Sequence, residues 1–349
     1  MVKEKNRIEN EEKSPVENEK VILSWVGEKV REKVSQTLKD FEYPKMARQI
    51  QENQITVNPG EAIQPAISRL LSQGGGTLFL ESGDYAIEEP LDVHSNLTIK
   101  GRGTDTLLRM KKGAWFTGAM IKNTKGGLHD LTIQDLVLDG NMDRKERTWT
   151  HYKDDPARAL PLGILISDEQ EMKNERIFIS GLTILRARMG VHIRGAQDII
   201  LSDCNMLDNG SGVGYNHNCY LRRTERVLIT DSKFTNSHSS NGLNLTSQNN
   251  VMVKDCFFGS NKNRGVRASV SRNVVFYRNT AVYNGLFGLG VIDEEGTVDS
   301  FLVADNLSIG NQHGLSVYGA SNGLITGNRC YDSVESDLQI RDNLNVEII

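Results

Sequence analysis

A short phrase of about two dozen residues recurs through the second half of the chain, and it constrains the fold more than any other feature. Each copy holds an apolar triplet, a polar turn and then Gly followed by Val or Leu. The copies begin at Ile177, Ile199, Val227, Val251, Val274, Phe301 and Gly323, in steps of 22, 28, 24, 23, 27 and 22 residues. Helical repeats keep a longer period and a 3.6-residue pattern, and neither is seen here. The sequence therefore predicts an all-β, single-stranded right-handed parallel β-helix of about nine to ten coils.

Two columns of small polar residues accompany the triplets. One column follows each triplet and the other precedes the next strand: Cys204, Ser232, Cys256, Asn279, Asn306 and Asn328, then Asn209, Asn236, Asn261, Asn284 and Asn311. Stacked amides can hydrogen-bond from coil to coil, so we assign these residues to ladders and turns. Four aspartates also recur beside the first column, and we expect them to cap turns and not to bind calcium: Asp203, Asp231, Asp255 and Asp305.

Charge and cysteine usage exclude several classes of partner. A formal net charge of -4 argues against a nucleic-acid partner, and no apolar run is long enough to span a membrane. The first residues lack the apolar region of a signal peptide, so a secreted or particle-surface location rests on the expected function. Cys204 and Cys256 would lie two coils, about 9.6 Å, apart, which is too far for a disulfide. Without a metal-ligand spacing, we expect neither a metal nor another cofactor, and no ligand cluster indicates calcium.

The chain divides into three segments. Residues 1–20 are a charged tail that we expect to be disordered. Residues 21–54 form an amphipathic helical extension, because apolar residues from Val26 to Phe41 recur at helical spacing. This helix is expected to dock on the β-helix, or to contact an oligomer partner or a particle. Residues 55–349 form the β-helix domain, which begins with a short capping helix over residues 59–71 and carries a long loop at 142–161.

Two stretches carry a resemblance to known proteins. The capping helix, Gly74-Gly75-Gly76-Thr77, an apolar strand and Gly83-Asp84-Tyr85 resemble the N-terminal cap of pectate-lyase-like β-helix proteins. Residues 131–141 and the coil starting at Ser211 resemble the catalytic modules of bacterial mannuronan C5-epimerases and of alginate lyases that share their fold. This resemblance implies an enzyme that acts on an anionic, uronate-containing polysaccharide. Those epimerases carry Asp-Pro-His where this chain has Asn216-His217-Asn218, so the lyase is favoured over the epimerase.

The candidate site follows from strand parity. Val191 and Ile193 point inward, so His192 and Arg194 occupy exposed outward positions, next to a coil lengthened to 28 residues. Arginines or amides could neutralise a uronate carboxylate while a His or Tyr removes the C5 proton. We therefore predict catalytic roles for His192, Arg194 and His217, and substrate binding by Asn216, Tyr220, Asn244 and Arg267.

The loop at 142–161 is the longest interruption of the repeat. Long loops without secondary structure are often functional, and this one combines aromatic and basic side chains. We expect it to form a wall of a substrate groove, with Tyr152 as a further catalytic residue and Trp149 and Lys153 binding sugar.

Two other functions remain open, and a third is disfavoured. A C5-epimerase could use the same cluster by returning the proton to the opposite face of the sugar. An inverting hydrolase is disfavoured, because the outward positions nearly lack the carboxylates it needs. A non-catalytic glycan-binding or tailspike-like structural protein would suit a β-helix preceded by an anchoring helix.

Overall fold

The computed structural model describes residues 28–47, 53–114, 116, 118–143, 145–146, 160–168, 174–212 and 215–349. Contacts divide the chain into two units, Met1–Phe41 and Glu42–Ile349. In the first unit, α2 (Glu28–Lys39) lies within the segment predicted to be helical. The predicted disordered tail lies outside the described residues, and the domain boundaries stay predictions.

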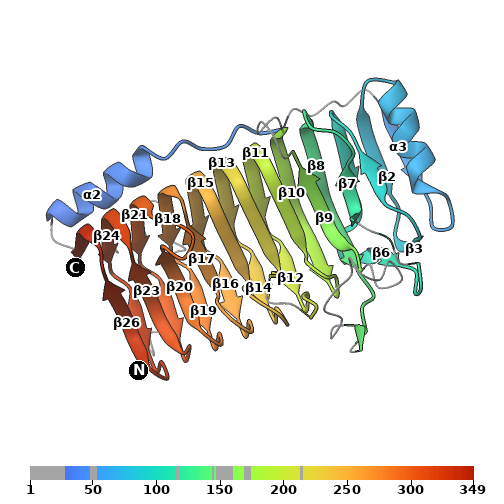
Figure 1. Ribbon diagram of the computed structural model, residues 1–349. Coiled ribbons are helices and arrows are strands. Elements are labelled where there is room, and N and C mark those ends of the chain that lie inside the picture. Colours follow the sequence, from blue (N-terminus) through green and yellow to red (C-terminus); the bar gives the residue numbers. More distant parts are fainter. Residues whose placement is uncertain are drawn as a thin grey trace, which may run out of the picture. The chain divides into compact units, whose positions relative to one another are not determined.

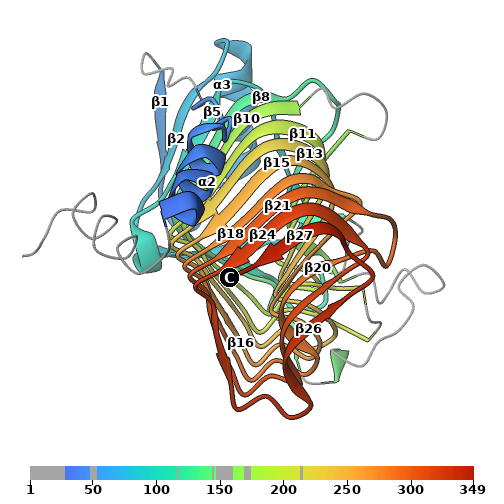
Figure 2. The ribbon, with the colours of Figure 1, turned by 90° about the vertical axis from the view of Figure 1, so that its left-hand side faces the viewer.

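The second unit is a right-handed parallel β-helix of about eleven turns (Figure 1), slightly more than the sequence predicted. Its strands stack in parallel register into three columns, and Figure 2 shows the coils one behind another. The first column holds β1 (Gln54–Val57), β2 (Gly76–Leu80), β5 (Leu97–Lys100), β8 (His129–Asp139), β10 (Asn174–Leu185), β11 (Val191–Ser202), β13 (Cys219–Thr230), β15 (Leu243–Lys254), β18 (Arg272–Tyr277), β21 (Val298–Ala304), β24 (Ala320–Thr326) and β27 (Leu344–Ile348).

The other two columns complete each coil. The second column holds β3 (Gly83–Ile87), β6 (Thr106–Met110), β12 (Asn205–Leu207), β14 (Lys233–Thr235), β16 (Phe257–Gly259), β19 (Thr280–Val282), β22 (Leu307–Ile309) and β25 (Arg329–Tyr331), and the ends of β8 and β10 join it. The third holds β4 (Leu91–Val93), β7 (Ala119–Asn123), β9 (Leu162–Ser167), the first halves of β11, β13 and β15, then β17 (Val266–Ser269), β20 (Phe287–Ile292), β23 (His313–Tyr318) and β26 (Ser336–Arg341).

Alternation along each strand builds the core. The residues that open the repeated triplets pair in register through successive coils, and all are buried: Ile177, Ile199, Val227, Val251, Val274 and Phe301. In the second column the rings of Phe234 and Phe258 stack with centroids 5.2 Å apart. Each coil therefore buries its apolar residues mainly against the coils before and after it.

The predicted cap is present at the start of the solenoid. Helix α3 (Ile63–Ser72) buries Ile63, Ile67 and Leu70 against the first strands, and a one-turn 3-10 helix follows at Gly103–Asp105. The glycine run is required by close backbone approach, because a Cβ on Gly76 would lie 2.3 Å from the carbonyl oxygen of Asn53. The resemblance to pectate-lyase-like caps thus has a packing reason.

Both polar columns form hydrogen-bonded ladders. In the first, Asn279 Nδ2 donates to Asn306 Oδ1 at 3.0 Å, and Asn306 Nδ2 donates to Asn328 Oδ1 at 2.9 Å. In the second, Asn261 and Asn284 each donate to the next amide, in Asn284 and Asn311, at 2.9 Å. The ladder assignment is confirmed for these residues.

One residue of the second column, Asn236, lies in a turn and does not join the ladder. Asn236 adopts the left-handed conformation with φ 52°, and the backbone N–H of the next residue, Ser237, donates to Asn261. The vacant ladder position is filled by Asn218 of the lengthened coil, which accepts from Asn209 Nδ2 at 3.0 Å and donates to Asn261 Oδ1 at 3.3 Å. Sequence spacing missed this because Asn218 reaches the ladder from outside the repeat register.

The recurring aspartates lie in turns, and the cysteines form no disulfide. Asp203, Asp231, Asp255 and Asp305 all occupy turns with φ between 51° and 55°, a left-handed conformation that short polar residues tolerate. The four cysteines are free thiols, and three are buried: Cys204, Cys219 and Cys256. Burial raises the pKa of Cys204 to about 12, so this thiol is inert at neutral pH.

Candidate functional site

Four of the predicted site residues lie on one line across the third column. His192, Tyr220, Asn244 and Arg267 are register partners in β11, β13, β15 and β17, one coil apart, and we call this line the His192 face. Arg194 heads a parallel line that continues through Arg222, Thr246 and Ser269. Coils of a parallel solenoid are spaced at about 4.8 Å, so the structure brings these side chains together.

A tyrosine lies against two histidines on the His192 face. The rings of His192 and Tyr220 stack with centroids 5.0 Å apart and an interplanar angle of 9°. The ring of His217 meets Tyr220 edge-on, at 5.3 Å and 67°. The lengthened coil therefore does reach the predicted cluster, and it does so through His217.

His217 is a buried, neutral imidazole with an assigned tautomer. The backbone N–H of Asn241 donates to its Nδ1 at 3.2 Å, so Nε2 carries the proton. Burial, reinforced by the charges of Arg267, His192 and Arg264, lowers its pKa to about 3. His217 therefore offers a hydrogen-bond donor at neutral pH.

His192 has a ring nitrogen that is buried and makes no hydrogen bond to the described residues. Its Nε2 is buried and has no hydrogen-bond partner among the described residues. Burial, and then the charges of Arg194, Arg188 and Arg222, lower the pKa of His192 to about 4. The expectation of an exposed outward position is wrong for this residue, because Tyr220 of the next coil covers its ring and leaves it half-buried. A buried polar atom without a partner requires an explanation, and a bound ligand is one.

Arg267 is the centre of a charged group that the sequence did not predict. Its guanidinium is buried and lies 3.3 Å from Glu294 and 3.2 Å from Glu295, and it donates to Ser269 Oγ at 2.9 Å. Glu294 also pairs with Arg264. Both glutamates belong to the turn after β20, so they lie outside the outward strand positions, which lack carboxylates as expected, and this acidic turn was not predicted. The run Asp293-Glu294-Glu295 at the end of an apolar strand was the signal that could have indicated it.

Hydrogen bonds connect this charged group to His217. Arg267 donates to Asn244 Oδ1 at 3.3 Å, and Asn241 Nδ2 donates to the same oxygen at 2.9 Å. Asn241 in turn fixes His217 through its backbone N–H. Asn244 is therefore held in a buried network, and Asn241 is a site residue that sequence parity missed because it precedes its strand.

Of the remaining predicted site residues, Asn216 bonds within its own loop and three are not described by the structure. Asn216 uses its side-chain amide within its own loop, where Nδ2 donates to the carbonyl of Ser211 at 2.7 Å. Its own carbonyl accepts from Ser239 Oγ at 2.7 Å. Trp149, Tyr152 and Lys153 lie outside the described residues, so their roles stay predictions.

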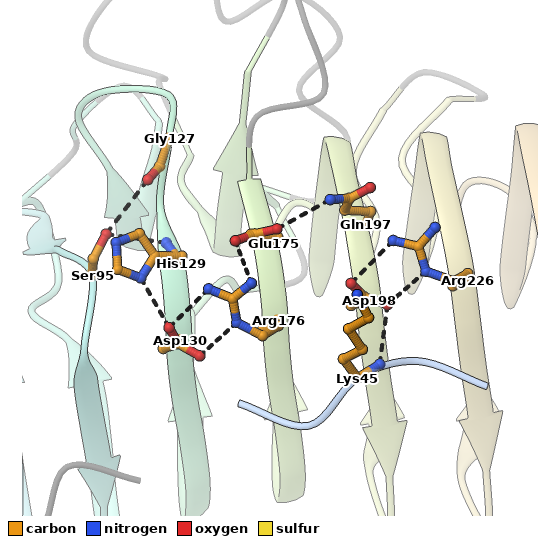
Figure 3. A network of polar contacts seen from close by, with 10 residues as sticks. All are labelled: Lys45, Ser95, Gly127, His129, Asp130, Glu175, Arg176, Gln197, Asp198 and Arg226. Carbon is orange, nitrogen blue, oxygen red and sulfur yellow. Dashed lines mark hydrogen bonds and ion pairs between the residues drawn. The ribbon is translucent and has the colours of Figure 1, made fainter. Parts of the chain in front are cut away.

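A second polar network lies at the turn beside the first column and has a structural role (Figure 3). Arg176 forms two hydrogen bonds with Asp130, at 2.7 and 2.9 Å, and Arg226 forms two with Asp198, at 2.7 and 3.1 Å. The backbone N–H of Lys45 also donates to Asp198 Oδ1 at 3.0 Å. Burial would raise the pKa of Asp198, but Arg226 and this N–H hold it below its usual value. These pairs clamp one coil to the next.

The described residues offer neither a metal-ligand cluster nor a membrane-spanning helix. No group of three or more His, Cys, Asp and Glu side chains among them could hold a metal ion. None of the helices in this part of the chain is long and apolar enough to cross a membrane. A cavity of about 660 Å³ lies against the cap, lined by residues of α3 and β3 such as Gln64 and Tyr85.

Comparison with known proteins agrees with the fold. The family model described as "Right handed beta helix region" matches residues 162–314, which contain the whole His192 face. The matched residues, less than half of the chain, form the central coils of the right-handed β-helix. By structure, the β-helix is similar to the A-module of the Azotobacter vinelandii mannuronan C-5 epimerase AlgE4, with a TM-score of 0.56 at 16% identity, covering 82% of this chain and 90% of that one. It is also similar to the tailspike of E. coli bacteriophage HK620, with a TM-score of 0.63 at 14% identity, covering 84% of this chain and 59% of that one.

Sequence similarity to curated proteins is confined to a short segment of this β-helix protein. Alginate lyase 7 of Azotobacter vinelandii is 35% identical over 97 residues, which are 25% of this chain and 11% of that protein. Mannuronan C5-epimerase AlgE1 of the same organism is 38% identical over 94 residues, which are 24% of this chain and 7% of that protein. The matched segment thus spans about a tenth of the length of these relatives, or less.

Proposed function

We propose that this β-helix protein is a polysaccharide lyase that cleaves a uronate-containing, alginate-like polymer by β-elimination on the His192 face. The observation that carries the proposal is the buried, unpartnered Nε2 of a neutral His192, stacked on Tyr220 and surrounded by arginines. A neutral imidazole can accept a proton, and the arginines favour a substrate that is an anion.

The reaction needs a base, an acid and a group that neutralises the sugar carboxylate. In our proposal, Arg194 and Arg222 bind the carboxylate and stabilise the charge that develops when the C5 proton moves to Nε2 of His192. The electrons of the C5–H bond form a C4–C5 double bond, and the C4–O4 bond breaks. Tyr220 gives its hydroxyl proton to the departing O4. Binding of the carboxylate would also offset the arginine charges and raise the pKa of His192, which strengthens the base.

Similarity to the alginate lyase supports this reaction, while similarity to the epimerase AlgE1 supports the alternative of C5 inversion. Both reactions begin with removal of the same proton. They diverge in whether O4 leaves or a proton returns to the opposite face. The tailspike likeness concerns the fold alone. A non-catalytic glycan-binding role is the alternative that remains if neither reaction occurs.

The test is a screen of uronate polymers. The full chain is incubated with alginate, polymannuronate, pectate and hyaluronan while the ultraviolet absorbance of unsaturated uronate is followed. Rising absorbance on at least one polymer supports the lyase. Proton NMR in D₂O detects the epimerase, since inversion without cleavage introduces deuterium at C5. Binding without either change would contradict an enzymatic function.

A substitution of His192 tests the assignment of the site. We expect His192→Ala to lower kcat on the cleaved polymer by about 10²- to 10⁴-fold, because the proton acceptor is lost. Removing the stack on Tyr220 should cost only about 1 kcal/mol of stability, measured by urea unfolding. His129→Ala is the matched control, because this histidine pairs with Asp130 outside the His192 face. Full turnover by His192→Ala would refute the assignment.

A further inference from the structure

A group of arginines on the His192 face is followed, one coil further along, by an acidic turn. Arginines accompany the coils from β11 to β17: Arg188, Arg194, Arg222, Arg264 and Arg267. The next coil, which contains β20, ends in the acidic turn Asp293-Glu294-Glu295. The side chains of Glu294 and Glu295 are 35% and 46% exposed, whereas that of Arg267, which they contact, is only 6% exposed. An anionic ligand would therefore be attracted on one side of Arg267 and repelled on the other.

The carboxylates of the acidic turn occupy the position that an anionic ligand would take. Arg267 holds Glu295 at 3.2 Å and Glu294 at 3.3 Å, while its remaining partners, Asn244 and Ser269, are neutral. Arginine presents a fork of donors that matches a carboxylate. A uronate carboxylate at this height would compete directly with Glu295 for the same guanidinium.

The two glutamates are not equally bound. Glu294 pairs with both Arg264 and Arg267, whereas Glu295 contacts Arg267 alone and is 46% exposed. Glu294 still lies 3.3 Å from Arg267 when Glu295 is changed, so the buried guanidinium keeps one counter-charge. Glu295 is therefore the residue through which competition can be tested.

We propose that Glu294 and Glu295 close one end of the uronate-binding face by holding Arg267 in place of a substrate carboxylate. They act as specificity-determining residues: charged sugars bind from the β17 coil toward the β11 coil, and the acidic turn excludes them beyond it. This inference rests on the proposed uronate specificity, and it adds the direction and the end of the binding path.

The experiment measures binding and not only cleavage. Wild type, Glu295→Gln and Glu295→Asp are titrated with oligomannuronates of increasing length by calorimetry, and turnover is recorded in parallel. We expect Glu295→Gln to bind the longer oligomers about threefold more tightly, because Arg267 becomes available to one more carboxylate. Glu295→Asp keeps the charge and should bind like wild type. The control is Glu335→Gln, an exposed carboxylate paired with His313, which should not change binding.

The outcomes separate this inference from the proposed reaction. If wild type binds oligomannuronates without cleaving them, the lyase is contradicted while the competition is still tested by the ratio of variant to wild-type affinity. Unchanged or weaker binding by Glu295→Gln would overturn the inference even if the lyase is active. Equal tightening by Glu295→Asp would show that charge is not the cause and would also overturn it. Absence of any binding by wild type would overturn both proposals.

Discussion

At the scale of single residues, the two histidines of the His192 face owe their charge state to different neighbours. His217 is fixed by a backbone N–H on one nitrogen and is sealed inside the coil. His192 is covered by one tyrosine ring and lies among arginines, with one nitrogen unused. The same residue type therefore serves as a fixed donor in one position and as an available acceptor in the other.

This arrangement predicts how stability depends on pH. The pKa of His217 is lowered to about 3 in the folded chain, so the unfolded chain binds a proton first as pH falls below 6.5. The free energy of unfolding should be highest above pH 6.5 and fall progressively down to about pH 3. Between pH 6.5 and pH 4.5, we expect His217→Gln to lose about 2 kcal/mol less than wild type.

Urea unfolding at those two pH values measures the difference. His129→Gln, which removes a partly exposed histidine, provides the control. An unchanged pH dependence in His217→Gln would show that His217 does not remain neutral in the folded chain.

At the scale of structural elements, strands and turns have different roles in the solenoid. Strands place apolar side chains inward and site residues outward, while the turns hold coils together through ladders and through arginine–aspartate clamps. Asp198 is 1% exposed, so its charge depends on Arg226 for compensation. The clamp is therefore expected to matter far more than an ion pair of the same geometry at the surface.

Removing one clamp tests that expectation. Arg226→Ala leaves a buried carboxylate without its guanidinium and should cost about 3 kcal/mol in the free energy of unfolding. The control Arg102→Ala breaks a similar two-bond pair with Glu81 at the surface and should cost much less, because solvent screens an exposed pair. Urea denaturation of both variants gives the comparison, and equal costs would contradict a special role for burial.

Much of the scaffold could be predicted from the sequence, because strand parity and a repeating step are local properties. They indicated the fold, both ladders and the shared outward face of His192, Asn244 and Arg267, but they did not place Tyr220 between His192 and Asn244. They could not indicate Glu294 or Asn241, because both residues lie outside strands, where side chains do not alternate between two faces. His192 is half-buried because the ring of Tyr220 in the next coil covers it. Residue spacing within one coil cannot predict a contact between coils.

At the scale of the whole β-helix, each coil contacts mainly the coils directly before and after it. The first coil is covered by α3, whereas β27 pairs only with β24 among the described strands and leaves Leu344 and Ile348 more than half exposed. In such stacks, local stability follows the number of neighbouring coils. The coils that hold the His192 face lie far from this edge along the chain.

Hydrogen exchange should report this gradient. Backbone amides of β13 and β15, enclosed on both sides, should exchange at least tenfold more slowly than those of β26 and β27. Mass spectrometry after timed labelling of the intact chain resolves these segments. Equal protection along the solenoid would instead indicate that it unfolds as one cooperative unit.

Asn218 has a consequence for how such a chain can acquire new surfaces. The lengthened coil would interrupt the amide ladder at Asn236, yet it delivers a substitute amide from its own extra residues. An insertion that restores the bond it displaces leaves the neighbouring coils undisturbed. A coil can therefore grow longer while the ladder stays continuous. In this way a solenoid can gain residues such as His217 in one coil without changes in the other coils.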